Sequence, residues 1–235
     1  MDDSKILVIT GKGGAGKTTI ATNLALALNR LKHEPILVDG NLHNPHVHVH
    51  FGIDDDKMPV NLHDVLTGKE SIHKAIYEHE SGLKLVPNKH TLKGFDLERS
   101  HHIKELKLHN NIVVVDGPSL GYELNNIMKI CDDFILIVNP EKSSVHDAMK
   151  IKRLAAHNGI FPMGIILNKY FNNKNELSKE EIEKAIELPI IGKVMYDNDV
   201  QWALGKNTPL MHLNPNHHIS KEIYKIASEL PYSVI

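Results

Sequence analysis

Cysteine, arginine and long apolar stretches are all scarce in this chain of 235 residues. The one cysteine, Cys131, excludes an internal disulfide and a metal site built on paired cysteines. No apolar run approaches the roughly 18 residues that a membrane-spanning helix needs, and Met1–Lys5 lacks the basic start of a secretory signal. The 27 basic and 29 acidic residues give a net charge of −2, hence no overall attraction to nucleic acid. We therefore expect a cytoplasmic protein.

Short β-rich runs alternate with amphipathic stretches along the whole chain. Several runs are apolar at consecutive positions, which is typical of strands buried on both faces of a parallel sheet. This alternation predicts an α/β fold with a doubly wound, mostly parallel sheet and helices on both faces, in a single domain over 1–235. The expected strands are 5–10, 35–39, 83–86, 112–116, 134–138, 164–168 and 189–194, and the clearest helices are 18–32, 143–157 and 178–187.

A glycine-rich segment after the first expected strand fits the phosphate-loop pattern G-x-x-x-x-G-K-[ST] and opens an expected helix. Glycines let successive backbone N–H groups point at phosphate oxygens, and the helix adds its positive dipole end. Lys17 is expected to reach the β- and γ-phosphates and Thr18 to bind Mg²⁺. A glycine-rich turn without a ligand is the alternative. The expected nucleotide contacts are Gly11, Lys12, Gly13, Gly14, Ala15, Gly16, Lys17, Thr18 and the next residue, Thr19.

A second lysine, Lys12, directly follows the first glycine of this loop. Here the sequence resembles the deviant Walker A ATPases of the MinD/ParA type, whose loop reads K-G-G-x-G-K-[ST]. The resemblance covers most of the chain and implies a P-loop NTPase fold, ATP and Mg²⁺ as ligands, and an ATP-state homodimer. In that family the extra lysine reaches the partner's nucleotide, which implies a catalytic role for Lys12 beside Lys17. The alternative is a solvated lysine beside a phosphate site.

Two acidic residues, Asp39 and Asp116, end expected strands. The carboxyl ends of parallel strands share one sheet edge, so both carboxylates are candidates to hold Mg²⁺, mostly through water. A role as helix cap or turn former is the alternative. The segments 39–41 and 116–118 resemble the family's Asp-x-Asp and Asp-x-Pro motifs.

One position departs from the family pattern. Where the family has the second Asp of Asp-x-Asp, which orients or activates the attacking water, this chain has Asn41. An amide can hydrogen-bond water but cannot accept its proton at neutral pH. We therefore expect ATP to bind well and to be hydrolysed slowly. A natural specialisation and an introduced Asp→Asn change that traps ATP both account for Asn41.

The choice of base rests on Asn168, which stands where the family contacts adenine. GTP-binding relatives commonly have Asn-Lys-x-Asp, whereas here Asn168 and Lys169 are followed by Tyr170 and Phe171. Phe171 lacks the carboxylate that accepts from guanine, and the Asn168 amide can pair with adenine's donor and acceptor. ATP is therefore the expected nucleotide.

Histidine is abundant, with 17 residues, and four lie within 43–50. On an extended segment, His46, His48 and His50 would project on one face and could bind Zn²⁺ or Ni²⁺. The favoured alternative is a histidine-rich structural segment. A metal site here would suit a second function, a metal-handling accessory ATPase for a client enzyme. An ATP-using ligase on the same fold is a third possibility, with no substrate residues that can be named.

The remaining segments bear on partners. Residues 219–230 predict a packed helix with a short tail, unlike the separate basic amphipathic helix with which bacterial MinD-like proteins bind membrane. Membrane targeting is therefore not expected, whereas DNA binding through scattered lysines stays open. Cys131 is expected to be buried, and a single cysteine argues against iron–sulfur relatives. The expected partners are a second copy of the chain and an unidentified protein.

Overall fold

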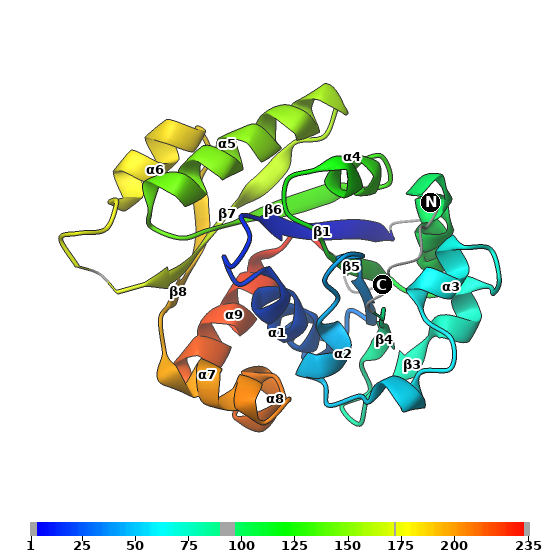
Figure 1. Ribbon diagram of the computed structural model, residues 1–235. Coiled ribbons are helices and arrows are strands. Elements are labelled where there is room, and N and C mark those ends of the chain that lie inside the picture. Colours follow the sequence, from blue (N-terminus) through cyan, green and yellow to red (C-terminus); the bar gives the residue numbers. More distant parts are fainter. Residues whose placement is uncertain (1–3, 90–96, 172, 233–235) are drawn as a thin grey trace.

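The computed structural model describes residues 4–89, 97–171 and 173–232, built around one eight-stranded sheet (Figure 1). Its order is β3-β4-β2-β5-β1-β6-β7-β8, with every neighbouring pair parallel except β3 and β4. The predicted fold class is confirmed. The strands are β1 (Lys5–Gly11), β2 (Pro35–Asp39), β3 (Tyr77–Glu78), β4 (Lys84–Val86), β5 (Ile112–Asp116), β6 (Asp133–Val138), β7 (Pro162–Tyr170) and β8 (Ile190–Met195).

Helices cover both faces of the sheet (Figure 1). One face carries α1 (Lys17–Arg30), α2 (Val47–His50), α7 (Asn198–Gly205), α8 (Leu210–Leu213) and α9 (His218–Glu229). The other carries α3 (Leu62–Leu66), α4 (Tyr122–Met128), α5 (Lys142–His157), α6 (Lys179–Ile186) and the 3-10 segments Ile72–Ala75 and Leu97–Leu108. A further 3-10 turn spans Asp55–Lys57.

The apolar runs form strands because both faces of each central strand are covered. In β1, Ile6 and Val8 join the core under α4 and α5, while Leu7 and Ile9 join the core under α1 and α9. All four side chains are fully buried. Consecutive apolar residues are therefore required, and their burial fixes the position of the loop that follows Gly11.

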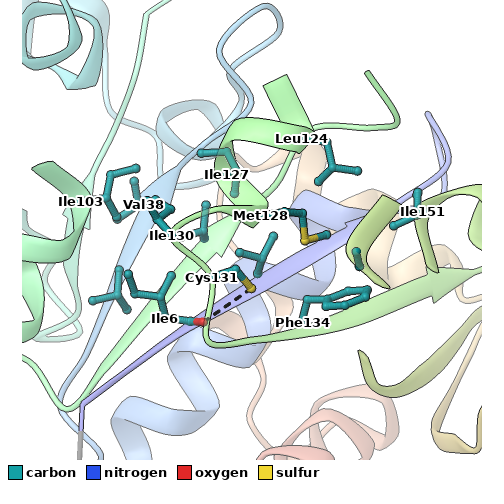
Figure 2. Packing of buried hydrophobic residues seen from close by; sticks show 14 of the residues in the cluster. Ile6, Val38, Ile103, Leu124, Ile127, Met128, Ile130, Cys131, Phe134 and Ile151 are labelled. Carbon is teal, nitrogen blue, oxygen red and sulfur yellow. Dashed lines mark hydrogen bonds between the residues drawn. The ribbon is translucent and has the colours of Figure 1, made fainter. Parts of the chain in front are cut away.

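Cys131 lies in the core at the turn between α4 and β6. Figure 2 shows it beside Ile6, Met128 and Phe134, with its sulfur directed at the carbonyl oxygen of Ile6. Its thiol also donates to the carbonyl oxygen of Asp133 at 2.8 Å, and burial raises the pKa of this thiol. The prediction of a buried, structural cysteine is confirmed.

The expected helices occur as α1, α5 and α6, with ends that differ by up to two residues. At the start of α6, Ser178 and Glu181 form a reciprocal capping box. The predicted C-terminal helix occurs as α9. In the parts of the chain that the structure describes, none of the helices combines the length and apolar character needed to span a bilayer.

Two local features differ from the patterns considered in the sequence. The edge strand β3 has only two residues, too few to show a periodicity, and was not predicted. The extended conformation that a shared face of His46, His48 and His50 would require does not occur, because residues 47–50 form the helix α2. Helical spacing removes the common face that three alternate residues share on a strand.

Candidate functional site

The loop between β1 and α1 lies at the carboxyl edge of the sheet. Gly16 caps α1 with a left-handed φ of 94°, and Gly14 has a φ of 78°. A Cβ atom on Gly16 would lie 2.3 Å from Asn168 Nδ2, so this position has no room for a side chain. The first turn of α1 holds Lys17, Thr18 and Thr19 and no acidic residue. This arrangement is suited to an anion at the helix start.

Lys17 is the buried cation of the loop, with only 8% of its surface exposed. Its Nζ donates to Ser119 Oγ at 2.8 Å and to the carbonyl oxygen of Lys12 at 3.3 Å. Both acceptors are neutral. Burial lowers the pKa of Lys17, while the nearby Asp116 opposes that shift. A buried ammonium group with neutral partners can be neutralised by a phosphate.

Lys12 points in a different direction from Lys17. Its Nζ contacts Glu141 Oε1 and Ser143 Oγ, each at 2.8 Å, in the loop that leads from β6 into α5. The hydrogen bond from Lys12 lowers the pKa of Glu141. In the single chain, this lysine is therefore held by its own subunit.

Asp39 and Asp116 face each other at the ends of β2 and β5, where they are register partners. Both are fully buried. Asp39 accepts hydrogen bonds from the backbone N–H groups of Val47 (2.9 Å) and Asn41 (3.3 Å). Burial and the neighbouring Asp116 raise the pKa of Asp39 well above its usual range, and burial raises the pKa of Asp116.

The residues around this pair fit a hard divalent cation. Asp116 Oδ2 accepts from Thr18 Oγ1 at 2.6 Å, whereas its Oδ1 is buried with no hydrogen-bond partner among the described residues. Two adjacent buried carboxylates repel each other unless a proton or a cation lies between them. Carboxylate and hydroxyl oxygens are the ligands that Mg²⁺ prefers. Thr18, Asp39 and Asp116 are therefore brought together as the sequence predicted.

A mostly apolar pocket adjoins the loop on the side of β7 and β8. Asn168 is one of its lining residues and donates from Nδ2 to the carbonyl oxygen of Ala15 at 2.8 Å. Asn139 supports it by donating to the carbonyl oxygen of Asn168 at 2.9 Å. Such a pocket suits a flat heterocycle next to a phosphate site. Its lining includes Thr19, Ile20, Asn168, Val194, Tyr196, Asp197, Val200, Leu210 and Ile223.

The structure adds site residues that the sequence motifs did not single out. Ser119 holds Lys17, and Lys169 Nζ donates to the carbonyl oxygen of Gly14 at 2.9 Å. Ser119 follows the Asp-Gly-Pro turn at 116–118, and this adjacency was the one available signal. Asn41 lies just past β2 with its backbone N–H on Asp39, at the same sheet edge.

Two of the four histidines in segment 43–50 contact different acidic residues. His43 lies 3.3 Å from Glu123 Oε1, and His48 lies 3.5 Å from Asp55 Oδ1. Burial lowers the pKa of His50 to about 4. These contacts agree with the favoured interpretation of a structural segment and give no support to the alternative, a shared metal-binding face on an extended chain.

Comparisons with known proteins agree with this geometry. A sequence model of the CobQ/CobB/MinD/ParA nucleotide binding domain matches residues 6–210. An uncharacterized ATP-binding protein of Methanocaldococcus jannaschii is 34% identical over 230 residues, which cover 96% of this chain and 86% of that protein.

Solved structures of MinD proteins are also similar. The septum site-determining protein MinD of Pyrococcus horikoshii, complexed with Mg-ADP, has a TM-score of 0.89 at 26% identity, covering 97% of this chain and 96% of that one. A chain of the MinC:MinD cell division complex of Aquifex aeolicus has a TM-score of 0.86 at 26% identity, covering 99% and 97%. The phosphate-loop geometry, the sheet order and these matches together show that the chain belongs to the CobQ/CobB/MinD/ParA family of nucleotide-binding domains.

Proposed function

We propose that the chain is a cytoplasmic ATPase that dimerises when ATP and Mg²⁺ are bound and thereby controls a partner protein. One observation carries the proposal: a buried Lys17, whose ammonium group donates hydrogen bonds to two neutral oxygens, lies beside a buried carboxylate pair whose Asp116 Oδ1 has no partner among the described residues. A phosphate group would neutralise the charge of Lys17, and Mg²⁺ would neutralise the charge of the two carboxylates.

ATP is favoured over other nucleotides by the pocket and by the relatives. The pocket beside Asn168 is lined largely by apolar side chains, and Phe171 stands where a guanine-binding motif would place an acid. The Methanocaldococcus relative is named for ATP binding, and the Pyrococcus structure holds Mg-ADP. Both support ATP as the substrate of this chain.

Different residues of the site have different roles in the hydrolysis of ATP. Backbone N–H groups of the loop and Lys17 hold the phosphates, and Asn168 orients the base. Thr18, Asp39 and Asp116 would hold Mg²⁺, largely through water, and the bound ion would supply positive charge to the phosphates. Asn41 hydrogen-bonds the water that attacks the γ-phosphate in line but cannot take its proton, so turnover is slow. Lys12 adds charge stabilisation from the partner subunit.

The dimer requires a change in the contacts of Lys12. This lysine is bound to Glu141 and Ser143 of its own chain, so it must leave them to reach a nucleotide in a second subunit. The MinC:MinD complex of Aquifex supports a protein partner for a MinD-like chain. We infer that the ATP-state dimer creates the surface that the partner recognises.

Light scattering in solution tests the switch. The mass is expected to double in Mg-ATP relative to Mg-ADP, and Lys12→Ala is expected to stay monomeric in both while still binding ATP. Lys74→Ala, which removes an exposed lysine paired with Glu70, is the matched control and is expected to dimerise normally. An unchanged mass in both nucleotides would reject the switch, and absent ATP binding would reject the whole proposal.

A further inference from the structure

We propose that His79, Glu80 and His212 form a binding site for a borderline divalent cation such as Zn²⁺. His79 and Glu80 lie in the turn between β3 and β4, and His212 lies in α8. One ligand atom from each residue lies within 4.8 Å of the other two. The proposal does not depend on nucleotide binding, since none of the three residues lines the nucleotide pocket.

Two imidazoles and one carboxylate are a ligand set that zinc uses, with a water molecule in the fourth position. In a tetrahedral site with bonds of about 2.0–2.1 Å, ligand atoms lie about 3.3 Å apart. His212 Nε2 is 2.8 Å from Glu80 Oε1. The rings of His79 and His212 have centroids 5.0 Å apart and planes at 77°. Modest side-chain movement therefore suffices to bring the three atoms around one ion.

One tautomer of His79 leaves a ring nitrogen available to bind the cation. Its Nδ1 lies 2.9 Å from Ser81 Oγ, so a proton on Nδ1 has an acceptor and Nε2 keeps a free lone pair. The backbone N–H of Ser81, at 3.2 Å, favours the opposite tautomer, and a bound cation would select the first. Phe51 packs edge-on against the ring at 4.9 Å and restricts its orientation.

Both segments that carry the ligands are fixed to the same helix. Asn29 of α1 donates to the carbonyl oxygen of Ser81 at 3.0 Å, which anchors the β3–β4 turn. Asn23 of α1 accepts from the backbone N–H of Met211 at 2.7 Å, which anchors α8. Because both anchors are on α1, the ligands are held near one another before any cation binds.

A second cluster of similar composition, Asp197 with His217 and His218, has a different explanation. His217 Nδ1 accepts from the backbone N–H of Ile219 and so caps α9. With Nδ1 accepting this bond, Nε2 is the ring's donor, and it lies 3.2 Å from Asp199 Oδ2. Helix capping and the contacts with Asp197 and Asp199 already account for these side chains, so we assign the cation site to His79, Glu80 and His212.

Equilibrium dialysis of the full chain against Zn²⁺, with Mg²⁺ in excess and no nucleotide, tests the site. The wild type is expected to bind one Zn²⁺ at this site. His79→Ala and His212→Ala are each expected to weaken that binding at least about tenfold, as loss of a ligand should. The melting temperature without zinc shows whether each variant is folded, and added Zn²⁺ should raise it in the wild type but not in His79→Ala or His212→Ala.

Two control variants separate this site from the general abundance of histidine. His157→Ala removes an exposed histidine at the end of α5, and His217→Ala disrupts the other cluster. Both are expected to bind Zn²⁺ like the wild type. The proposal is overturned if the wild type takes up no zinc, if His79→Ala and His212→Ala bind as tightly as the wild type, or if His217→Ala alone removes binding. ATP binding is unaffected by any of these outcomes.

Discussion

The two carboxylates at the ends of β2 and β5 are the most unfavourable residues in the site when no cation is present. Asp39 and Asp116 are fully buried side by side, and Asp116 Oδ1 has no hydrogen-bond partner in the described part of the chain. Their raised pKa values reflect the free energy needed to ionise them in place. In the proposed function, this cost in stability is what a cation site at this edge of the sheet requires.

Asp116→Asn is expected to stabilise the metal-free protein at pH 7 by about 1–3 kcal/mol. The folded-state pKa of Asp116 lies above its unfolded value, so the folded state holds the proton longer. The free energy of unfolding of the wild type therefore falls as the pH rises from the unfolded pKa through the folded one. Urea unfolding in EDTA at pH 7 and at pH 4 measures this, and the advantage of Asp116→Asn should shrink at pH 4.

The same comparison with Mg-ATP provides the control. The wild type is expected to be stabilised strongly by Mg-ATP and Asp116→Asn only weakly, because the variant lacks a carboxylate for the cation. Equal stabilisation of both proteins by Mg-ATP would show that Asp116 is not part of the metal site.

Asn41→Asp is expected to raise the turnover of ATP tenfold or more, the scale of a regained acid–base contribution. The backbone of residue 41 already donates to Asp39, so the substitution keeps the turn in place. Phosphate release at saturating Mg-ATP gives the rate, and ATP affinity should change little. A rate no higher than that of the wild type would show that Asn41 is not at the catalytic position.

At the scale of elements, the loop between β1 and α1 depends on Gly16. Its φ of 94° is unfavourable for residues with a side chain, and a Cβ would meet Asn168 Nδ2 at 2.3 Å. Gly16→Ala is therefore expected to weaken ATP binding at least about tenfold by displacing Asn168, in addition to about 1–2 kcal/mol of backbone strain. Calorimetric titration with ATP measures the affinity.

Gly159→Ala is the matched control for that substitution. Gly159 has a φ of 73° in the turn after α5, and a Cβ there meets nothing within 4 Å. Its strain should lower the melting temperature in a similar way without altering ATP affinity. Loss of ATP binding in both variants would assign the effect to strain rather than to the contact with Asn168.

The elements differ in how far the sequence predicts them. β1 and β5 are recognisable because burial on both faces demands uninterrupted apolar runs, and Asp116 is recognisable because it ends such a run. The helix α2 is not recognisable from the sequence, since four residues are too few to show a helical period. Contacts such as that of Asn23 with Met211, which are 188 residues apart, leave no local signal. The phosphate loop is a local pattern, whereas the pocket and its supports are assembled by the fold.

At the scale of the whole molecule, we expect the ion pair of Lys12 with Glu141 to oppose the proposed dimerisation. Glu141→Gln weakens the hold on Lys12, while Ser143 keeps its contact. An exposed pair of this kind is worth about 0.2–1 kcal/mol, and a dimer contains two, so the Mg-ATP dimer should tighten by roughly two- to thirtyfold. Sedimentation over a range of protein concentrations measures the dimer dissociation constant.

The control variant is Glu187→Gln, which weakens an exposed pair with Lys152 at 2.9 Å on another part of the surface. Its dimer constant should match the wild type. A weaker dimer in Glu141→Gln would mean that Glu141 contributes to the interface instead of restraining Lys12.

The burial of Cys131 has a practical consequence for single-molecule work. Cys131 is 6% exposed and the pKa of its thiol is raised, so we expect maleimide reagents not to label it. Phe161, 74% exposed just before β7, is a natural attachment position for an introduced cysteine. It lies seven residues from Asn168, about 20 Å along an extended strand. A fluorophore or surface tether can thus be attached far from the nucleotide pocket without first removing the native cysteine.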